Sequence, residues 1–212
     1  MEIAVIDYGN GNLGSLLAAL RRLNQDPHVV RTAQDIRDVD TLIFPGVGSL
    51  TKVIDRLKAH GLLSWLNEMH AAQRPILGIC LGLQLFFDQG AEGGEGLHWL
   101  QGSVPEIHAP ILPHIGWNTV ESTSHPYLWK DITRPYTFYF VHSYRITPEN
   151  RSIIRGFTQY HETFPVAIEA PPLYGVQFHP ELSGDSGARF LKNYLALVAN
   201  PDQGPGTEKS QA

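Results

Sequence analysis

Pro75-Ile76-Leu77-Gly78-Ile79-Cys80-Leu81-Gly82-Leu83-Gln84 holds the only cysteine of the chain at the point where a buried strand is predicted to turn into a helix. The apolar run 75–79 predicts the strand, and the run 81–87 predicts the start of the helix. Glycines stand two residues before and two residues after Cys80, which is the thiol form of the nucleophile elbow, a sharp turn that needs glycine. At such a turn the N–H groups and the dipole of the next helix favour a thiolate. The alternative is a buried, inert cysteine, which is common for free thiols.

A candidate base lies near the C-terminal end, in Tyr174-Gly175-Val176-Gln177-Phe178-His179-Pro180-Glu181. This segment reads as a strand that runs into a stiff turn. Side chains two apart in an extended segment point the same way, so Glu181 is placed to bind one nitrogen of His179 and leave the other for Cys80. Nucleophile, base and orienting carboxylate make a catalytic triad. A His-Pro-Glu sequence alone is more often a surface turn, but together with the elbow it favours catalysis.

The first half of the chain alternates strands and helices. Strands are predicted at 3–7, 29–30 and 41–44, with helices over 13–23 and from about 50 to 69. Repeated β–α units of this kind predict an α/β fold, in which a central, mostly parallel sheet has helices on both faces. The second half predicts an antiparallel extension from short β runs divided by prolines, and then a final helix. The runs are 137–144, 153–157, 166–170 and 174–178, and the helix covers about 186–198.

Length and composition fit one globular domain, since the 212 residues are 42% hydrophobic and 17% charged. We expect this domain to span residues 1–200 and the polar segment 201–212 to be a disordered tail. A formal net charge of -5 argues against binding to nucleic acid or to an anionic membrane. The single cysteine fits a reducing compartment, and neither a signal-like segment nor a membrane-spanning run is present. We therefore expect a cytoplasmic protein.

Six motifs make nearly the whole chain resemble the class I, or triad, glutamine amidotransferases, in which they occur in the same order. Asp-Tyr-Gly-x-Gly-Asn-Leu, Pro-Gly-Val-Gly and Pro-His-x-Gly-Trp-Asn are similar, within that family, to the glutaminase subunits of imidazole glycerol phosphate synthases. Leu83 and Leu182 depart from the Met and Lys expected at those positions, where no chemistry takes place. The six motifs are Asp7–Leu13, Phe44–Gly48, Gly78–Gly82, Pro113–Asn118, Tyr139–Tyr144 and Gly175–Glu181.

The resemblance implies a class I glutamine amidotransferase fold and the hydrolysis of L-glutamine to L-glutamate and ammonia, without a cofactor. Cys80 would attack the side-chain amide, His179 would take the thiol proton, and Glu181 would hold the imidazole. It also implies a heterodimer with a (β/α)₈-barrel cyclase, which uses the ammonia to make imidazole glycerol phosphate and AICAR from PRFAR in histidine biosynthesis.

Attack on the amide generates an oxyanion, which needs preorganised donors. The N–H of Leu81, directly after the nucleophile, is the first candidate, and the loop Gly46-Val47-Gly48 is expected to supply the second. The alternative for this loop is a plain turn before a helix. By resemblance, the loop reorients before the oxyanion hole is complete, which would keep the resting enzyme nearly inactive.

Glutamine binding is assigned by resemblance to two segments. Gln84 matches the position that contacts bound glutamine, and the backbone of His142, Ser143 and Tyr144 matches the segment that receives the amino-acid head group. The alternatives are an ordinary surface glutamine for Gln84 and a structural histidine for His142.

Three residues are candidates for the partner interface: Asn12, Trp117 and Tyr139. An aromatic side chain in a Pro/Gly-rich loop, as predicted for Trp117, suits an interface anchor. A core tryptophan is the alternative.

Two further patterns suggest ligands that we do not expect. Gly9–Gly14 spells the dinucleotide-binding sequence G-x-G-x-x-G, and Asp35 follows it, but Thr32–Asp35 reads better as a helix-capping box. Ten histidines raise the question of a metal, yet His-x-x-x-His and cysteine-rich clusters are absent from the sequence. His108 and His114 are expected in a Pro-rich loop with no carboxylate nearby. No metal site is predicted.

Two other functions compete with this interpretation. One is a glutaminase for pyridoxal phosphate or anthranilate synthesis, against which the motifs around Asp7 and Trp117 argue. The other is a catalytically silent subunit that regulates a synthase, against which the complete set of Cys80, His179 and Glu181 argues.

Overall fold

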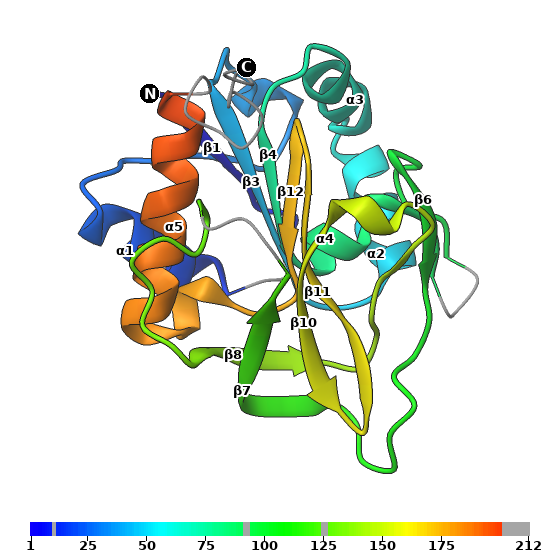
Figure 1. Cartoon of the computed structure of the whole chain (residues 1–212). Coiled ribbons are helices and arrows are strands. Elements are labelled where there is room, and N and C mark those ends of the chain that lie inside the picture. The colour runs from blue at the N-terminus through cyan, green and yellow to red at the C-terminus, as the bar shows by residue number, and fades with distance from the viewer. Residues whose placement is uncertain (10–11, 91–93, 124–126, 201–212) are drawn as a thin grey trace, which may run out of the picture.

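A nine-stranded mixed sheet forms the centre of the molecule, with helices on both faces (Figure 1). The computed structural model describes residues 1–9, 12–90, 94–123 and 127–200. Asn10 and Gly11 of the N-terminal motif and the tail predicted at 201–212 lie outside the described residues. Within those ranges, no helix is long and apolar enough to cross a bilayer.

The parallel half of the sheet confirms the prediction from the alternating first half of the chain. Its strands run in the order β2-β1-β3-β4-β12, and each neighbouring pair is parallel. Their bounds are β1 Ile3–Ile6, β2 His28–Val30, β3 Thr41–Gly46, β4 Ile76–Cys80 and β12 Leu173–Val176. The flanking helices are α1 Leu13–Arg22, α2 Leu50–Ala59, α3 Leu63–Ala71 and α5 Gly184–Ala199.

The predicted antiparallel extension is present and is larger than expected. β11 (Glu162–Ala170), β10 (Ile154–Tyr160), β7 (His114–Ser122) and β8 (Tyr136–His142) follow β12 in the sheet, all with antiparallel neighbours. β7 was predicted as a Pro/Gly-rich loop, and that prediction is wrong. The strand forms because it pairs with β8 over its length from His114 to Val120.

Helix lengths differ from the sequence prediction at two places. The helix after Cys80, α4, covers only Leu81–Gln84, because Phe87 already begins strand β5 (Phe87–Gly90) of a second sheet. The helix expected from 50 to 69 is two helices, which separate at Gly61, whose φ of 71° only glycine adopts easily. The second sheet adds β6 (Leu100–Val104) and β9 (Thr147–Pro148), and single 3₁₀ turns lie at η1 Ala33–Asp35, η2 Arg151–Ile153 and η3 Pro180–Leu182.

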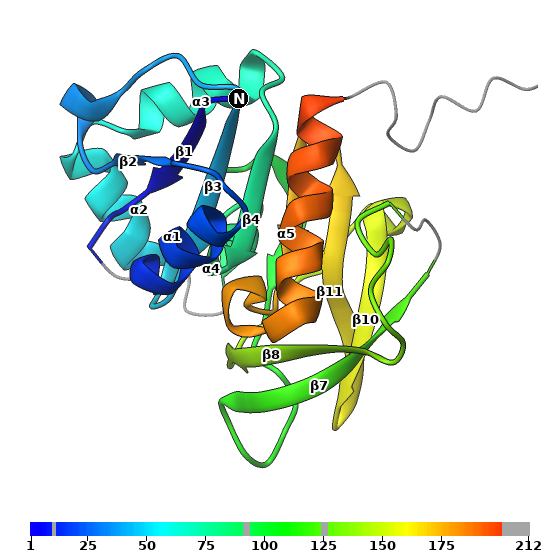
Figure 2. The ribbon, with the colours of Figure 1, turned by 90° about the vertical axis from the view of Figure 1, so that its left-hand side faces the viewer.

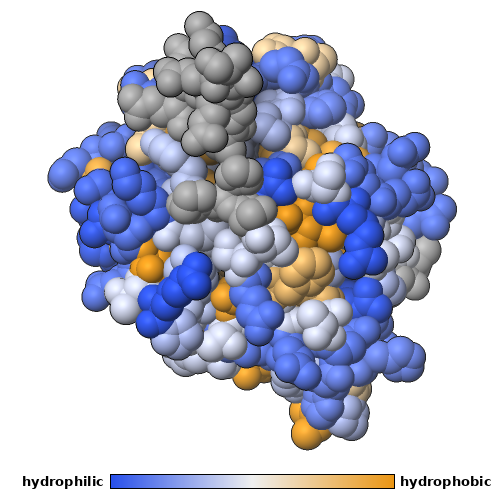
Figure 3. All heavy atoms as spheres, viewed as in Figure 1, coloured by the Kyte–Doolittle hydropathy of each residue, from blue (hydrophilic) through white to orange (hydrophobic). Residues whose placement is uncertain are grey.

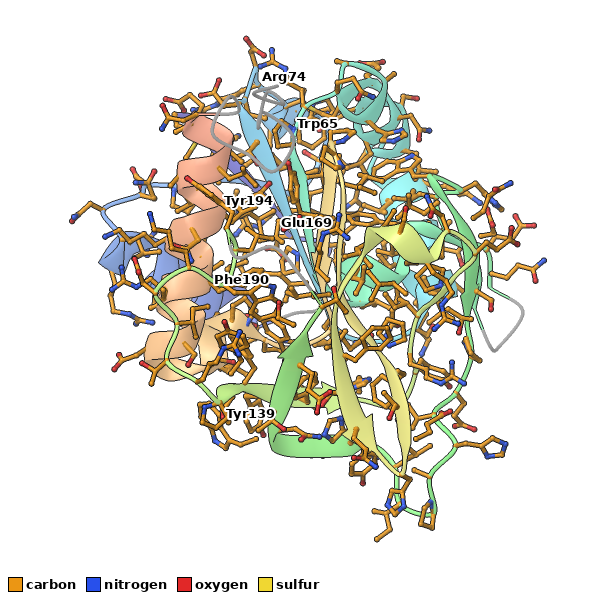
Figure 4. The ribbon with its side chains drawn as sticks, in the orientation of Figure 1. Trp65, Arg74, Tyr139, Glu169, Phe190 and Tyr194 are labelled. Atoms are coloured by element: carbon orange, nitrogen blue, oxygen red, sulfur yellow. The ribbon has the colours of Figure 1, made fainter. Side chains whose placement is uncertain are left out.

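Strands β1, β3, β4 and β12 of the parallel half each contribute residues to both of two hydrophobic cores. Ile3 and Val5 of β1 face the layer of α1 and α5, whereas Ala4 and Ile6 face that of α2 and α3. Figure 2 shows α1 and α5 together on one face, and in Figure 4 Phe190 and Tyr194 lie between α5 and the sheet. The carboxyl ends of the parallel strands meet at the edge near α4 (Figure 1), where ligands bind in sheets of this kind.

Candidate active site

Cys80 lies at the strand-to-helix turn that the sequence predicts. β4 ends at Cys80 and α4 starts at Leu81. The cysteine has φ 54° and ψ -107°, a backbone conformation that is strained for a residue with a side chain. A Cβ on Gly82 would overlap the carbonyl oxygen of Phe44, and one on Gly78 would lie 2.6 Å from the backbone nitrogen of Leu83. Both glycines are therefore required by the close approach of β3, β4 and α4.

The short length of α4 changes one argument from the sequence. A helix of four residues has only a small dipole, so the dipole does little to favour a thiolate at Cys80. Individual donors and charges near the sulfur must do this instead.

His179 and Glu181 form the pair expected from the sequence, although the backbone between them is not extended. His179 stands directly before the 3₁₀ turn η3 and Glu181 lies within it, and His179 Nδ1 is 2.8 Å from Glu181 Oε1 with both side chains almost fully buried. A carboxylate only accepts, so Nδ1 carries a proton. Nε2 is buried and has no hydrogen-bond partner among the described residues.

The electrostatics of His179 couple it to Cys80. Burial alone would lower the imidazole pKa, but the negative charge of the Cys80 thiolate and the hydrogen bond to Glu181 outweigh it and raise the pKa well above its usual range. A protonated His179 beside a thiolate is the reactive state of a cysteine nucleophile.

Two further groups contact the sulfur. Cys80 Sγ lies 3.8 Å from the carbonyl oxygen of Val141, and the side-chain amide of Gln177 donates a hydrogen bond to it at 3.4 Å. Sequence reasoning gave Gln177 no role. A signal was available, because Gln177 directly follows β12 and stands two residues before His179 in the chain.

The loop predicted to complete the oxyanion hole packs tightly against the elbow. Gly46 ends β3, and a Cβ there would lie 2.5 Å from the hydroxyl oxygen of Tyr8 and 2.8 Å from Leu81 Cβ. Gly48 has a φ of 114°, so its backbone conformation is one that only glycine adopts easily. The N–H of Val47 donates to the Tyr8 hydroxyl at 3.1 Å. In this conformation that N–H is occupied and does not serve an oxyanion.

A small cavity lies between this loop and α4. Gly48 and Leu50 line it on the loop side, Leu81 and Gln84 on the helix side, and Tyr144 also lines it. Its volume is about 20 Å³, which is room for roughly one water molecule.

Gln84 is buried, so the alternative of an ordinary surface glutamine is wrong. Its amide nitrogen donates to the carbonyl oxygen of Tyr144 at 3.2 Å and to Gln177 Oε1 at 3.0 Å. Gln84 thus joins the segment predicted to receive the glutamine head group to the side chain that contacts Cys80.

The segment 142–144 is held by hydrogen bonds within the protein. His142 Nδ1 donates to Tyr144 O at 2.7 Å, its Nε2 lies 3.0 Å from His114 Nδ1, and Ser143 O accepts from Ile107 N. The side chain of His142 is therefore structural. Burial lowers the pKa of His142 to about 3 and that of His114 to about 4, so both rings are neutral near pH 7.

Two expectations about histidines are wrong. His114 lies in strand β7 rather than in a loop. His108 has a carboxylate beside it, because its backbone N–H donates to Glu162 Oε1 at 2.8 Å.

The candidate interface residues Trp117 and Tyr139 face each other across β7 and β8. Their rings are 6.0 Å apart at 77°, and Trp117 is 58% exposed, so it is not a core residue. Ile111 and Ile115 are also exposed. Figure 4 shows Tyr139 at the lower end of the molecule, and hydrophobic residues appear at the lower tip in Figure 3, near the loop before β7.

Trp117 and Tyr139, called the aromatic face below, lie next to His179. The backbone N–H of His179 donates to the Tyr139 carbonyl at 2.9 Å, and Ser183 Oγ accepts from Tyr139 N. Asn12, the third interface candidate, is half-buried and stands directly before α1, where its carbonyl accepts from Leu16 N.

The dinucleotide-like pattern has a structural explanation. Asp35 accepts from the backbone N–H groups of Arg31 and Thr32, which confirms the capping box and leaves its carboxylate bound to its own turn. In the part of the chain that the structure describes, no group of three or more His, Cys, Asp or Glu residues is arranged to hold a metal ion.

Comparison with known proteins agrees with this geometry. The family model for class-I glutamine amidotransferases matches residues 4–197. The chain is 42% identical over 199 residues to imidazole glycerol phosphate synthase subunit HisH of Moorella thermoacetica, covering 92% of this chain and 95% of the relative. It is 38% identical over 200 residues to the subunit of the same name from Oceanobacillus iheyensis, covering 92% and 99%.

Solved structures support the fold. A glutamine amidotransferase crystal structure has a TM-score of 0.72 at 16% identity, covering 94% of this chain and 100% of the other. The structure of PurLQS from Thermotoga maritima has a TM-score of 0.71 at 15% identity, covering 93% and 98%.

Proposed function

Because the chain belongs to the class-I glutamine amidotransferase family, we propose that Cys80, His179 and Glu181 are the catalytic triad with which it hydrolyses L-glutamine to L-glutamate and ammonia. The observation that carries this proposal is the buried His179–Glu181 pair, whose imidazole interacts with the sulfur of an elbow cysteine.

The reaction follows from the charges at the site. The Cys80 thiolate attacks the amide carbon of glutamine, and the imidazolium of His179 gives its proton to the leaving nitrogen, which departs as ammonia. The glutamyl thioester that remains is attacked by water, whose proton returns to His179 Nε2. Glu181 fixes the imidazole tautomer through Nδ1 and stabilises its charged form.

The oxyanion of each tetrahedral intermediate needs two donors. We assign the Leu81 N–H, at the start of α4, and a donor from Gly46-Val47-Gly48 once that loop has moved. The occupied Val47 N–H supports a resting state of low activity. Gln84 and the backbone of 142–144 are assigned to the glutamine head group.

The partner we propose is a (β/α)₈-barrel cyclase, which would use the ammonia to make imidazole glycerol phosphate in histidine biosynthesis. The relatives are named as subunits of imidazole glycerol phosphate synthase, which supports a heterodimer. Free ammonia largely protonates in neutral water and loses its nucleophilicity, so a sealed passage favours its transfer. We place the contact at Asn12, Trp117 and Tyr139, and the compartment in the reducing cytoplasm, where Cys80 stays a free thiol.

The test is the synthase reaction of the complex with two nitrogen sources. Cys80→Ser and Cys80→Ala should abolish synthesis from glutamine and leave synthesis from added ammonia intact, because only glutamine hydrolysis needs the sulfur. Loss of both activities would instead give Cys80 a structural role and overturn the proposal.

A further inference from the structure

Gln177 is a buried amide in contact with the reacting sulfur, yet the mechanism above gives it no role. It lies just beyond β12, it is fully shielded from solvent, and its amide nitrogen is 3.4 Å from Cys80 Sγ. Burial of a polar amide against a sulfur, without exposure to water, is costly unless its hydrogen bonds are made.

The direction of this hydrogen bond is fixed by chemistry rather than by the choice of amide orientation. The carbonyl oxygen of Tyr144 can only accept, so the Gln84 atom that faces it must be the NH₂ nitrogen. The same nitrogen faces Gln177, so the Gln177 atom at that contact must be its oxygen. The NH₂ group of Gln177 is thereby turned toward Cys80.

The Tyr144 carbonyl oxygen accepts a second hydrogen bond. His142 Nδ1 donates to Tyr144 O, His114 Nδ1 donates to His142 Nε2, and Asn118 Nδ2 lies 3.2 Å from His114 Nε2. Each ring nitrogen in this series has one consistent role, donor at Nδ1 and acceptor at Nε2. Two donors therefore meet at the Tyr144 carbonyl oxygen, His142 Nδ1 from the side of β7 and the Gln84 amide from the side of the nucleophile.

The two contacts of the sulfur favour opposite protonation states. The Val141 carbonyl accepts from a thiol S–H and repels a thiolate, whereas an N–H donor stabilises the thiolate. We propose that Gln177 is a further catalytic residue, which stabilises the Cys80 thiolate by a hydrogen bond whose direction is set through Gln84 by the carbonyl of Tyr144. Gln177 transfers no proton, since the thiol proton moves to His179 Nε2. The inference rests on the proposed function of Cys80 as nucleophile.

The experiment is alkylation of the folded chain by iodoacetamide across a range of pH, which reports only on Cys80 because the chain has one cysteine. Gln177→Met keeps the approximate volume and removes the donor. We expect the pH midpoint of alkylation to rise by about one unit, as for the loss of one hydrogen bond to a charged group. Gln177→Glu keeps an acceptor for Gln84 and puts a carboxylate beside the sulfur, so its midpoint should rise further.

The matched control is Gln101→Met, the same change at an exposed glutamine in β6, whose midpoint should equal that of the unmodified chain. Circular dichroism checks that each variant is folded, and the Glu variant decides the matter if the Met variant does not fold. Midpoints of the folded Gln177 variants that equal the control would overturn the proposal. A raised midpoint in a chain that releases no glutamate even with its partner would support the Gln177–sulfur contact and reject the proposed function.

Discussion

At the scale of single residues, the site holds two features that are unfavourable for folding alone. Cys80 has a positive φ, and His179 Nε2 is buried without a partner among the described residues. The positive φ of Cys80 costs on the order of 1–3 kcal/mol. Both features are explained if the sulfur must point out of the sheet and the imidazole must be ready to exchange a proton with it. Strain and missing hydrogen bonds of this kind concentrate at functional sites.

Tyr8 binds the loop Gly46-Val47-Gly48, to which we assign the second oxyanion donor. Its hydroxyl accepts from Val47 N–H, and burial raises its pKa, so it stays protonated. Tyr8→Phe keeps the ring that packs edge-on against Phe44 and removes only the hydroxyl. Because one neutral hydrogen bond contributes about 1 kcal/mol, we expect glutamate release by the isolated chain to rise about fivefold.

The control for this variant is Tyr160→Phe, which loses an exposed hydroxyl that donates to Ile111 O, away from the loop. Glutamate release with the partner and its nucleotide substrate should be unchanged in Tyr8→Phe, since the loop is then already released. A fall in the activity of the isolated Tyr8→Phe chain would mean that the hydroxyl holds the loop in its active conformation.

At the scale of elements, the active site depends on how closely β3, β4 and α4 approach one another. Gly82 has no room for a Cβ because the Phe44 carbonyl of β3 lies against it. Gly82→Ala should therefore lower the free energy of unfolding by about 3 kcal/mol, as overpacking of a core against backbone does. Urea unfolding measures this change.

Gly14→Ala is the matched control for that measurement. Gly14 lies in α1 with nothing within 4 Å of the position of a Cβ. Because alanine favours helix more than glycine does, this variant should be as stable as the parent or more stable by up to about 1 kcal/mol. Equal losses of the free energy of unfolding in Gly82→Ala and Gly14→Ala would mean that the close approach of Phe44 to Gly82 does not matter.

The pairing of β7 and β8 makes stability depend on pH. The pKa of His142 is about 3 in the folded chain and about 6.5 in the unfolded chain. Below pH 6.5 the unfolded state therefore binds one more proton, so stability is complete above that pH and falls by about 1.4 kcal/mol per pH unit on acidification. Urea unfolding between pH 7 and pH 5 should show this slope together with the contribution of His114.

His142→Phe should lower the slope of the free energy of unfolding against pH by the contribution of one proton. This holds whatever the substitution does to stability at pH 7. His108→Phe, at an exposed position, should leave the slope unchanged. An unchanged slope in His142→Phe would mean that His142 is not held neutral by burial.

The sequence was sufficient where a local pattern decides the structure. The strand before Cys80, the alternation of β1 to β4 with helices, and the Thr32–Asp35 cap all follow from short-range rules and were predicted. β7 was missed because its exposed side carries Ile115 and Trp117, so hydrophobic and polar residues do not alternate. The helix break at Gly61 was missed because the apolar spacing continues through it.

Part of the candidate site could not be read from the sequence, for a different reason. The hydrogen bonds of Gln177 join residues that are 93 and 97 positions apart in the chain. The Tyr8–Val47 contact likewise depends on how β1 and β3 lie side by side. Such contacts are consequences of the sheet order, and no local pattern predicts them.

At the scale of the whole molecule, the aromatic face and the triad lie at the same end of the sheet. Tyr139 contributes its ring to that face and its backbone to the hydrogen bonds around His179 and Ser183. A partner that binds Trp117 would thus contact the residue paired with Tyr139, whose backbone is hydrogen-bonded to His179. Binding of a partner could in this way change the position of His179, independently of the Tyr8–Val47 contact.

Trp117→Ala tests the location of the interface. Exposed tryptophans that become buried in a complex contribute about 2 kcal/mol or more, so the Kd for the cyclase should rise at least about 30-fold. Arg74→Ala is the control, because Arg74 lies at the opposite end of the molecule from Tyr139 (Figure 4). Isothermal titration calorimetry gives both constants, and equal Kd values for the two variants would place the interface elsewhere.

The central claim is that this chain is a glutaminase whose activity is released by a cyclase partner. The most direct measurement is glutamate release from glutamine by the purified chain, first alone and then with a candidate barrel cyclase and its nucleotide substrate. We predict very low release by the chain alone and strong stimulation by the cyclase and substrate together. High release that the cyclase does not change would contradict the gating by a partner, and no release under either condition would contradict the assignment of Cys80, His179 and Glu181 as a working triad.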